Sequence, residues 1–458
     1  RRWLPVAARA SGVSLVLLTA GLVAGAHWAY VELGWGGYWA WDPVENGGLL
    51  PWLAAVAFLH AAVVARRGGG PAVAAAGLAA LAFVLGLLGS FLTRSGATES
   101  VHAFAEARVV GWVLGTVLVL ASAASGLLLA RARRRRSAPP WRPVRVLSVP
   151  GAVSANHVLL VGLVVVIGFG TVFPVLARWV TGERVVVTGR YFALVAAPPA
   201  ALLLALIGAG PRLGWGGRAV GELASRMRPA AFGLLAAAVA GIWFADRRPL
   251  AIVLVGLAGA AAALTVAEWR RRPRARWPVA HLGVAVLLAG VAGTTTGTSV
   301  TASLARGQEV TVRDYRFRLL DVVPAVAPDG GRAAEARIAL GRGDQTLSTL
   351  RPVALVSDLG ERVSVASLRS TPLIDVQVAL RSVGEGGDVV VVEIGVLPLM
   401  QLVWWGGLLL VAGLALTVLG GVGRGRPAGP EEMAGGDGAR HQPEADPEQV
   451  DDRVGRPV

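Results

Sequence analysis

The chain has 458 residues, of which 54% are hydrophobic and 16% charged, and its formal net charge is +15. Uncharged runs of about 20 residues recur along it, each long enough to cross a membrane as a helix. The positive charges gather in short clusters between these runs, as in the cytoplasmic loops of membrane proteins, so nucleic acid is not needed to explain them. The absence of cysteine excludes disulfides, thiolate metal sites and thiol nucleophiles of the chain's own.

Ten membrane-spanning helices are expected, and the connections between them alternate in charge. The arginine-rich connections are placed in the cytoplasm by the positive-inside rule. The opposite connections, which include a tryptophan-rich loop and a long segment at 298–398, are placed outside. The expected helices cover residues 10–30, 43–65, 71–92, 109–130, 154–177, 191–209, 230–245, 249–267, 278–297 and 399–421.

Segment 298–398 favours β-branched residues and alternation, with turn residues at 329–331 and 384–387. We therefore expect an all-α polytopic membrane protein of about ten transmembrane helices, with one small antiparallel β domain inserted on the outer, periplasmic side. The tail lacks apolar periodicity and is expected to be disordered and cytoplasmic. The expected organisation is a helical region at 1–297 with an aromatic loop at 31–48, a β domain at 298–398, a last helix at 399–421 and a tail at 422–458.

The loop before the second expected helix is rich in aromatic residues, because Trp35, Tyr38, Trp39 and Trp41 fall within seven positions. The loop ends in a predicted helix start, where Asp42 can act as the N-cap, a proline follows, and an acid comes three residues later. An aromatic platform beside a capped membrane helix suits a flat, partly apolar ligand at the water boundary. The alternative is an aromatic belt, since Trp and Tyr gather at membrane interfaces without any ligand.

Five of the six histidines lie in or beside expected membrane helices, where polar residues are often functional. His60 and His281 both lie near the cytoplasmic ends of their helices. Two imidazoles at one depth on different helices are suited to be the axial ligands of a b-type haem. His157 lies at a similar depth, so depth alone leaves any two of the three open. Unrelated packing histidines are the other alternative.

A second group lies on the outer side. His102 follows Arg94 there and is well placed to reach the aromatic loop, and His27 also lies near the outer end of its helix. An outer histidine, aromatic faces and Arg94 would suit a haem whose propionates need a cation. Ordinary snorkelling of Arg94 to the interface is the alternative. No nucleophile triad, nucleotide-binding loop or His-Glu-x-x-His pair stands out, so the sequence predicts ligand binding and not hydrolysis.

Residues 35–46, Trp-Gly-Gly-Tyr-Trp-Ala-Trp-Asp-Pro-Val-Glu-Asn, resemble the tryptophan-rich "WWD" signature of haem-handling membrane proteins. Together with their flanks and further matches along the chain, they resemble the CcmF family of cytochrome c biogenesis proteins. The signature alone is shared with other haem handlers, whereas the ordered set is specific to the CcmF type. The further matches lie at 93–96, 100–104, 170–174, 189–192, 280–283, 315–317, 398–399 and 404–407.

The resemblance implies a subunit of the bacterial cytochrome c haem lyase in the inner membrane, with its haem site facing the periplasm. Such proteins accept haem from the haem chaperone CcmE and work with CcmH/CcmI-type thioredoxin-like and apocytochrome-binding subunits. Together they join haem to apocytochrome c, so any enzyme activity belongs to several polypeptides. A haem exporter or carrier without ligation activity and a small-solute transporter are the alternatives.

The resemblance also implies roles for individual residues. His60 and His281 match the pair that ligates a resident haem b, and His102 matches the histidine after the signature loop that ligates the incoming haem. The loop would bind that incoming haem. His157 stands where the family often has Asn. The loop residues that the resemblance places at the incoming haem are Trp35, Tyr38, Trp39, Trp41 and Asp42.

One family ligand has no match. The histidine that precedes the signature loop is expected upstream of residue 1, in a longer protein of which this chain is the later part. Alternatively His27, which stands where the family more often has Trp, replaces it. Tyr38 stands where the family often has a second Trp, and this exchange keeps an aromatic face.

Overall fold

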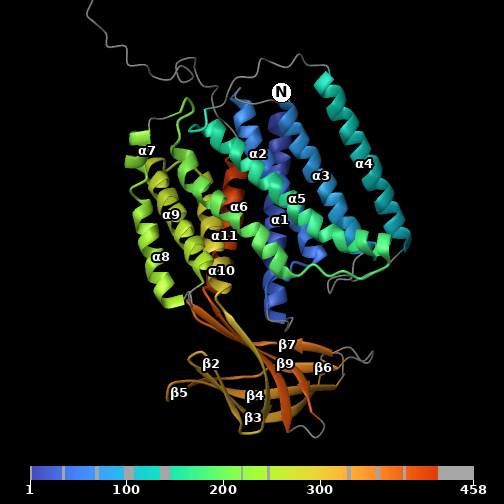
Figure 1. Cartoon of the computed structure of the whole chain (residues 1–458), viewed down its shortest axis with the longest axis vertical. Coiled ribbons are helices and arrows are strands. Elements are labelled where there is room, and N and C mark those ends of the chain that lie inside the picture. Colours follow the sequence, from blue (N-terminus) through green and yellow to red (C-terminus); the bar gives the residue numbers. More distant parts are fainter. Residues whose placement is uncertain are drawn as a thin grey trace, which may run out of the picture.

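The computed structural model shows a bundle of helices with a β domain against one end (Figure 1). Trp35, His102 and the expected tail lie outside the residues that the structure describes. The described residues are 3–32, 37–67, 72–96, 108–134, 145–217, 220–244, 248–326, 332–356, 362–384 and 388–420.

Nine helices of the described part are long and apolar enough to cross a membrane, and they coincide with nine of the ten expected spans. The tenth, α8 (Ala230–Phe244), has 15 residues and reaches only about 22 Å, less than the thickness of a bilayer core. The short helix α7 within a basic connection was not expected. The helices are α1 (Leu4–Glu32), α2 (Pro43–Arg66), α3 (Ala72–Arg94), α4 (Arg108–Arg134), α5 (Val149–Thr181), α6 (Gly189–Ala209), α7 (Val220–Arg226), α8 (Ala230–Phe244), α9 (Pro249–Arg271), α10 (Trp277–Thr294) and α11 (Met400–Leu419), with a 3₁₀ turn at Gly210–Arg212.

Helices α2 and α3 approach closely where two glycines meet. A Cβ on Gly47 would lie 3.0 Å from the Cα of Gly89, and a Cβ on Gly89 would overlap the Gly47 carbonyl. Small residues allow this approach because membrane helices associate through close packing. The contact places the end of α3, which carries Arg94, beside the start of α2.

Replacing Gly89 by alanine should therefore destabilise the bundle, by about 1–3 kcal/mol for overpacking against backbone. Gly86 is the matched control, because it lies one turn earlier in α3 and an added Cβ meets nothing within 4 Å. G86A should leave the denaturation temperature in detergent unchanged or slightly raised, since alanine favours a helix interior. Equal denaturation temperatures for the two variants would contradict the close contact.

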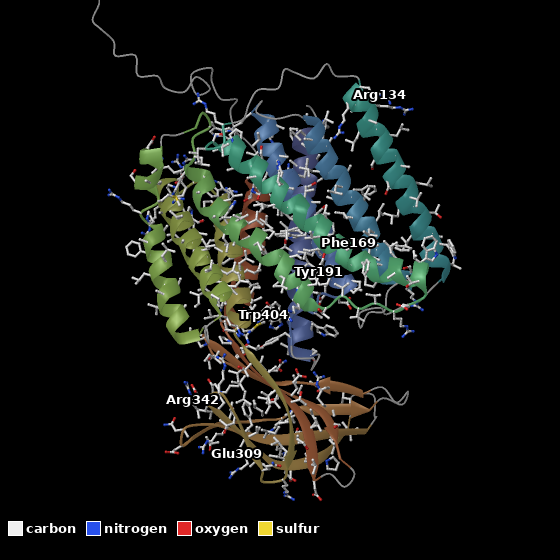
Figure 2. The ribbon with its side chains drawn as sticks, in the orientation of Figure 1. Arg134, Phe169, Tyr191, Glu309, Arg342 and Trp404 are labelled. Carbon is white, nitrogen blue, oxygen red and sulfur yellow. The ribbon has the colours of Figure 1, made fainter. Side chains whose placement is uncertain are left out.

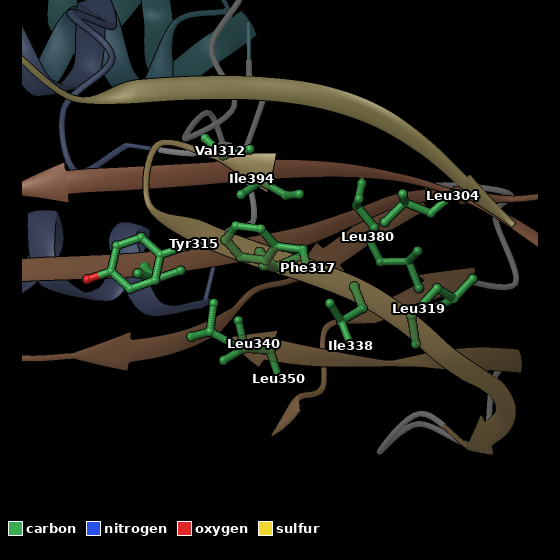
Figure 3. Close-up of a cluster of buried hydrophobic side chains, with 14 of the residues drawn as sticks. Leu304, Val312, Tyr315, Phe317, Leu319, Ile338, Leu340, Leu350, Leu380 and Ile394 are labelled. Carbon is green, nitrogen blue, oxygen red and sulfur yellow. The ribbon is translucent and has the colours of Figure 1, made fainter. Parts of the chain in front are cut away.

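The β domain connects α10 to α11, and its core lies between two antiparallel sheets. The four-stranded sheet has the order β1-β10-β9-β8, and the second has the order β2-β3-β4-β6-β7 with β5 also pairing with β4. Phe317, Ile338, Leu380 and Ile394 point into the space between them (Figure 3). The expected antiparallel β region is thus confirmed. The strands are β1 (Thr298–Ala305), β2 (Glu309–Val312), β3 (Tyr315–Val326), β4 (Arg332–Arg342), β5 (Gln345–Leu350), β6 (Val353–Val356), β7 (Arg362–Val365), β8 (Ser367–Ser370), β9 (Ile374–Val383) and β10 (Val389–Pro398).

Candidate functional site

The aromatic loop ends in the predicted capping box. Asp42 is extended, with φ −63° and ψ 147°, and its Oδ1 accepts a hydrogen bond of 2.7 Å from the Val44 backbone N–H. Glu45 Oε2 accepts from the backbone N–H groups of Asp42 at 3.2 Å and Ala40 at 2.9 Å. Two acidic side chains therefore hold the last part of the loop onto the first turn of α2.

Trp41 has a backbone conformation that side chains rarely adopt, with φ 61°. Its carbonyl accepts a hydrogen bond of 3.0 Å from Asn46 Nδ2, which also donates to Thr171 Oγ1 of α5 at 3.0 Å. The Trp41 ring stacks on Phe192 of α6, with centroids 5.1 Å apart and planes 5° apart. These contacts with α2, α5 and α6 together fix the Trp41 indole. They also hold its backbone in a left-handed conformation, which costs roughly 1–3 kcal/mol and is typical of functional sites.

The other loop aromatics lie on two sides. The Trp39 ring meets the edge of Trp41 at 6.2 Å, and its Nε1 is buried without a hydrogen-bond partner among the described residues. Tyr38 packs instead against Trp404 of α11 at 6.2 Å, and its hydroxyl shares a hydrogen bond of 3.2 Å with Thr294 Oγ1. Burial raises the pKa of the Tyr38 hydroxyl, against the smaller effect of that hydrogen bond. The loop thus bridges α6 and α11, and the unpaired Trp39 N–H can donate to a bound group.

Trp404 is the centre of an aromatic cluster that the sequence reasoning did not assign to the site. Its ring contacts His27 at 4.8 Å, Tyr30 at 5.6 Å and Tyr38 at 6.2 Å. Figure 2 shows Trp404 at the end of the bundle that faces the β domain. His27, an exposed residue, lies on the Tyr38 side of the loop. The only sequence signal for Trp404 was its membership of the matched stretch at 404–407.

Arg94, also exposed, is the last residue of α3, near the start of α2 through the Gly47–Gly89 contact. Asn46, by contrast, is fully buried, and neither it nor Phe192 was predicted as a site residue. Asn46 ends the matched stretch 35–46, and Phe192 ends the matched stretch 189–192, so the signal was present without a stated role.

At the other end of α2, the structure brings His60 and His281 together. Their ring centroids lie 6.0 Å apart, with the planes at 85°. His60 Nδ1 lies 2.9 Å from the Val56 carbonyl and His281 Nδ1 lies 3.0 Å from the Trp277 carbonyl, each one helical turn back. With Nδ1–H donating to a carbonyl, Nε2 of each ring carries the lone pair and is free to bind a metal.

His157 lies close to His60, one member of this pair. The Asn46–Thr171 hydrogen bond and the contact of Gly168 with Leu50 set the register of α5 against α2. His60 and His157 lie equally far along their antiparallel helices from that bond, which places them opposite each other. His157 Nε2 is buried without a hydrogen-bond partner in the described part of the chain. Depth therefore does not separate the three histidines in the structure. Among the described residues, however, the only two of these three rings that contact each other are those of His60 and His281.

The donor set of the His60–His281 pair fits the iron of a haem. Two neutral imidazoles from different helices, with ring centroids 6.0 Å apart, are a donor set that would hold such an iron. Hydrogen bonds from Nδ1 to carbonyls orient such ligands and raise their basicity. The arrangement can hold a flat metal complex among α2, α5 and α10.

Comparison with known proteins finds similarity to cytochrome c biogenesis proteins. Residues 2–99 match the family described as Cytochrome C assembly protein. The chain is 32% identical over 430 residues to the cytochrome c-type biogenesis protein CycK of Bradyrhizobium diazoefficiens, covering 89% of this chain and 64% of CycK. It is 29% identical over 415 residues to the cytochrome c-type biogenesis protein CcmF of Escherichia coli, covering 87% of this chain and 63% of that protein.

A solved structure titled "Cytochrome c Heme Lyase CcmF" is also similar. It matches with a TM-score of 0.73 and 26% sequence identity, over 90% of this chain and 66% of that chain. The chain thus spans just under two thirds of the length of these proteins.

Proposed function

The chain belongs to the CcmF family of cytochrome c-type biogenesis proteins, and from that premise we propose that it is the haem-handling part of a bacterial cytochrome c haem lyase. In this role it holds one resident haem b within the membrane and presents a second haem, the substrate, at the outer surface. The observation that carries the proposal is the contact of His60 with His281, each with Nδ1 fixed by a carbonyl one turn back.

His60 and His281 are the residues that would hold the iron of the resident haem. When bound, this group supplies a one-electron redox centre. The protein's contribution is to fix both partly buried imidazoles in the tautomer that leaves Nε2 free.

The aromatic loop is the proposed site of the substrate haem. Trp39 and Trp41, with Trp35 and Asp42, offer faces and polar groups for a flat ring, and Arg94 is the cation for a propionate. His102 is the proposed iron ligand. Tyr38 is proposed to belong to the same site and also fixes the loop to Trp404.

Attachment itself joins a haem vinyl to a thiol of apocytochrome c. The sulfur bonds to one vinyl carbon and a proton adds to the other, so no group leaves. Because the thiols belong to the apocytochrome, this chain's work is to hold the haem in position, and proximity supplies much of the rate.

The placement of the loop and the β domain supports a periplasmic site. Both lie at one end of the bundle, since Tyr38 bonds Thr294 at the end of α10, from which β1 follows (Figure 1). The basic loops belong to the other end, which the positive-inside rule places in the cytoplasm. We propose that haem arrives there from CcmE, that CcmH/CcmI-type subunits bring apocytochrome c, and that the membrane is the bacterial inner membrane.

Haem content of the purified chain is the first test. Pyridine-haemochrome analysis should find b-type haem, about one per protein, because two oriented imidazoles bind it. Protein purified free of haem from haem-replete cells, and unable to take it up on titration, would favour a small-solute transporter. A haem exporter is separated from a lyase by the resident haem, which an exporter does not need.

A further inference from the structure

A buried carboxylate lies where the β domain meets the helices. Asp375 of β9 is 0% exposed, and its Oδ2 accepts a hydrogen bond of 3.0 Å from the Tyr30 hydroxyl near the end of α1. Gln401 Nε2, in the first turn of α11, donates to both carboxylate oxygens at 3.1 Å. One side chain of the β domain thus bonds two membrane helices that are far apart in the sequence.

Burial of this acid carries a cost that its surroundings only partly offset. Burial raises the pKa of the Asp375 carboxyl, while hydrogen bonds from Gln401, Tyr30, Ser370 and Thr371 act in the opposite direction. Within the described ranges no arginine forms an ion pair with it. We call the contact of Asp375 with Tyr30 and Gln401 the seam. An apolar residue would fill this seam at a lower free-energy cost, so the carboxylate is expected to specify one arrangement of β9, α1 and α11.

Further contacts strengthen the same seam. Gln377 Nε2, also on β9 and buried, donates to the Tyr30 carbonyl at 2.8 Å. The Leu399 backbone N–H donates to the Leu373 carbonyl at 2.7 Å, so the start of α11 is tied to the turn that precedes β9. The C-terminal end of α1 and the start of α11 are therefore both held by β9 and the turn that precedes it.

The seam is linked to the aromatic loop through Trp404. Tyr30 lies 5.6 Å from the Trp404 ring, and Gln401 lies one helical turn before it. The other side of Trp404 meets Tyr38 of the loop. The two helix residues that hydrogen-bond Asp375, Tyr30 and Gln401, thus lie next to the indole against which the loop rests, one by ring contact and one on the preceding turn of α11.

We propose that Asp375 is a positioning residue of the substrate-haem site, acting through Tyr30 and Gln401 to hold Trp404 against Tyr38. The β domain then sets the orientation of the loop, and a change in β9 alters a site on the helices. The consequence for haem rests on the proposed function, whereas the consequence for the loop does not.

Loop order can be measured without haem. Because the chain has no cysteine, an A40C variant carries a single spin label, at an exposed loop position whose contact with Glu45 is through backbone. In the whole protein, D375A should make this label clearly more mobile in the electron paramagnetic resonance spectrum. D375N should have a smaller effect, since its amide oxygen still accepts from Tyr30. Y30F, which removes only the hydroxyl, tests the same bond if D375A fails to fold.

D321N is the matched control, because Asp321 is a carboxylate of the same domain in an exposed pair with Arg306. It should leave label mobility unchanged. In D375A, titration with added haem should show roughly threefold to tenfold weaker binding, with the resident haem content unchanged. Label mobility as in wild type for D375A and Y30F would overturn the inference, as would a parallel loss of resident haem, which would show general unfolding. Unchanged haem affinity with a mobile loop would instead count against the loop as the substrate-haem site.

Discussion

His60→Ala and His281→Ala should each lose the resident b-type haem almost completely. Each substitution removes one of two proposed axial ligands, and the remaining imidazole holds the iron from one side only. The Nδ1 bonds to Val56 and Trp277 are also lost, but each contributes only about 1 kcal/mol, so the protein should still insert and fold. Pyridine-haemochrome analysis of protein purified in parallel with wild type measures the effect.

His157→Ala is the matched control for this pair. His157 shares the depth, the helix environment and the free Nε2, so it tests ligation and not the mere presence of a buried imidazole. It should retain haem at the wild-type level. If both His60→Ala and His281→Ala keep full haem while His157→Ala loses it, the proposed pairing is wrong.

His102→Ala should abolish cytochrome c maturation while the resident haem remains. The residue is the proposed iron ligand of the substrate haem, and without it the vinyl groups are no longer held at the apocytochrome thiols. The assay is covalent haem attached to a reporter cytochrome c in cells that depend on this protein for maturation. Haem content of the same purified variant serves as the internal control.

His27→Ala separates the two outer histidines. His27 packs on Trp404 at 4.8 Å, on the Tyr38 side of the loop, so we expect it to support the aromatic cluster and to reduce maturation only partly. A wild-type yield of cytochrome c in His102→Ala would contradict the role of His102 as the iron ligand of the substrate haem. Complete loss in His27→Ala with full activity in His102→Ala would make His27 the ligand.

Local patterns predicted the local structure well. The capping box at Asp42 followed from the order of Asp, Pro and Glu alone, and the structure contains each of its bonds. Nine spans followed from hydrophobic length, and α8 fell short because its apolar stretch has too few residues for a bilayer. Alternation and turn residues predicted the β region in the same way.

Contacts between distant residues were not predictable in this way. Asp375 and Tyr30 are 345 positions apart, and Tyr38 and Thr294 are 256 apart, so no periodicity or spacing relates them. The division of the loop between Trp404 and Phe192 likewise depends on how α6 and α11 pack. His60 and His281 could be paired by depth and by resemblance, but depth alone could not exclude His157, and the structure places His157 opposite His60 on α5.

The ligation state of the resident haem iron tests the central claim most directly. Electron paramagnetic resonance of the oxidised purified protein should give the low-spin spectrum of a haem with two imidazole ligands, and that signal should disappear in both His60→Ala and His281→Ala. A high-spin signal in the wild type, or a two-imidazole signal that persists when either histidine is replaced, would contradict the account.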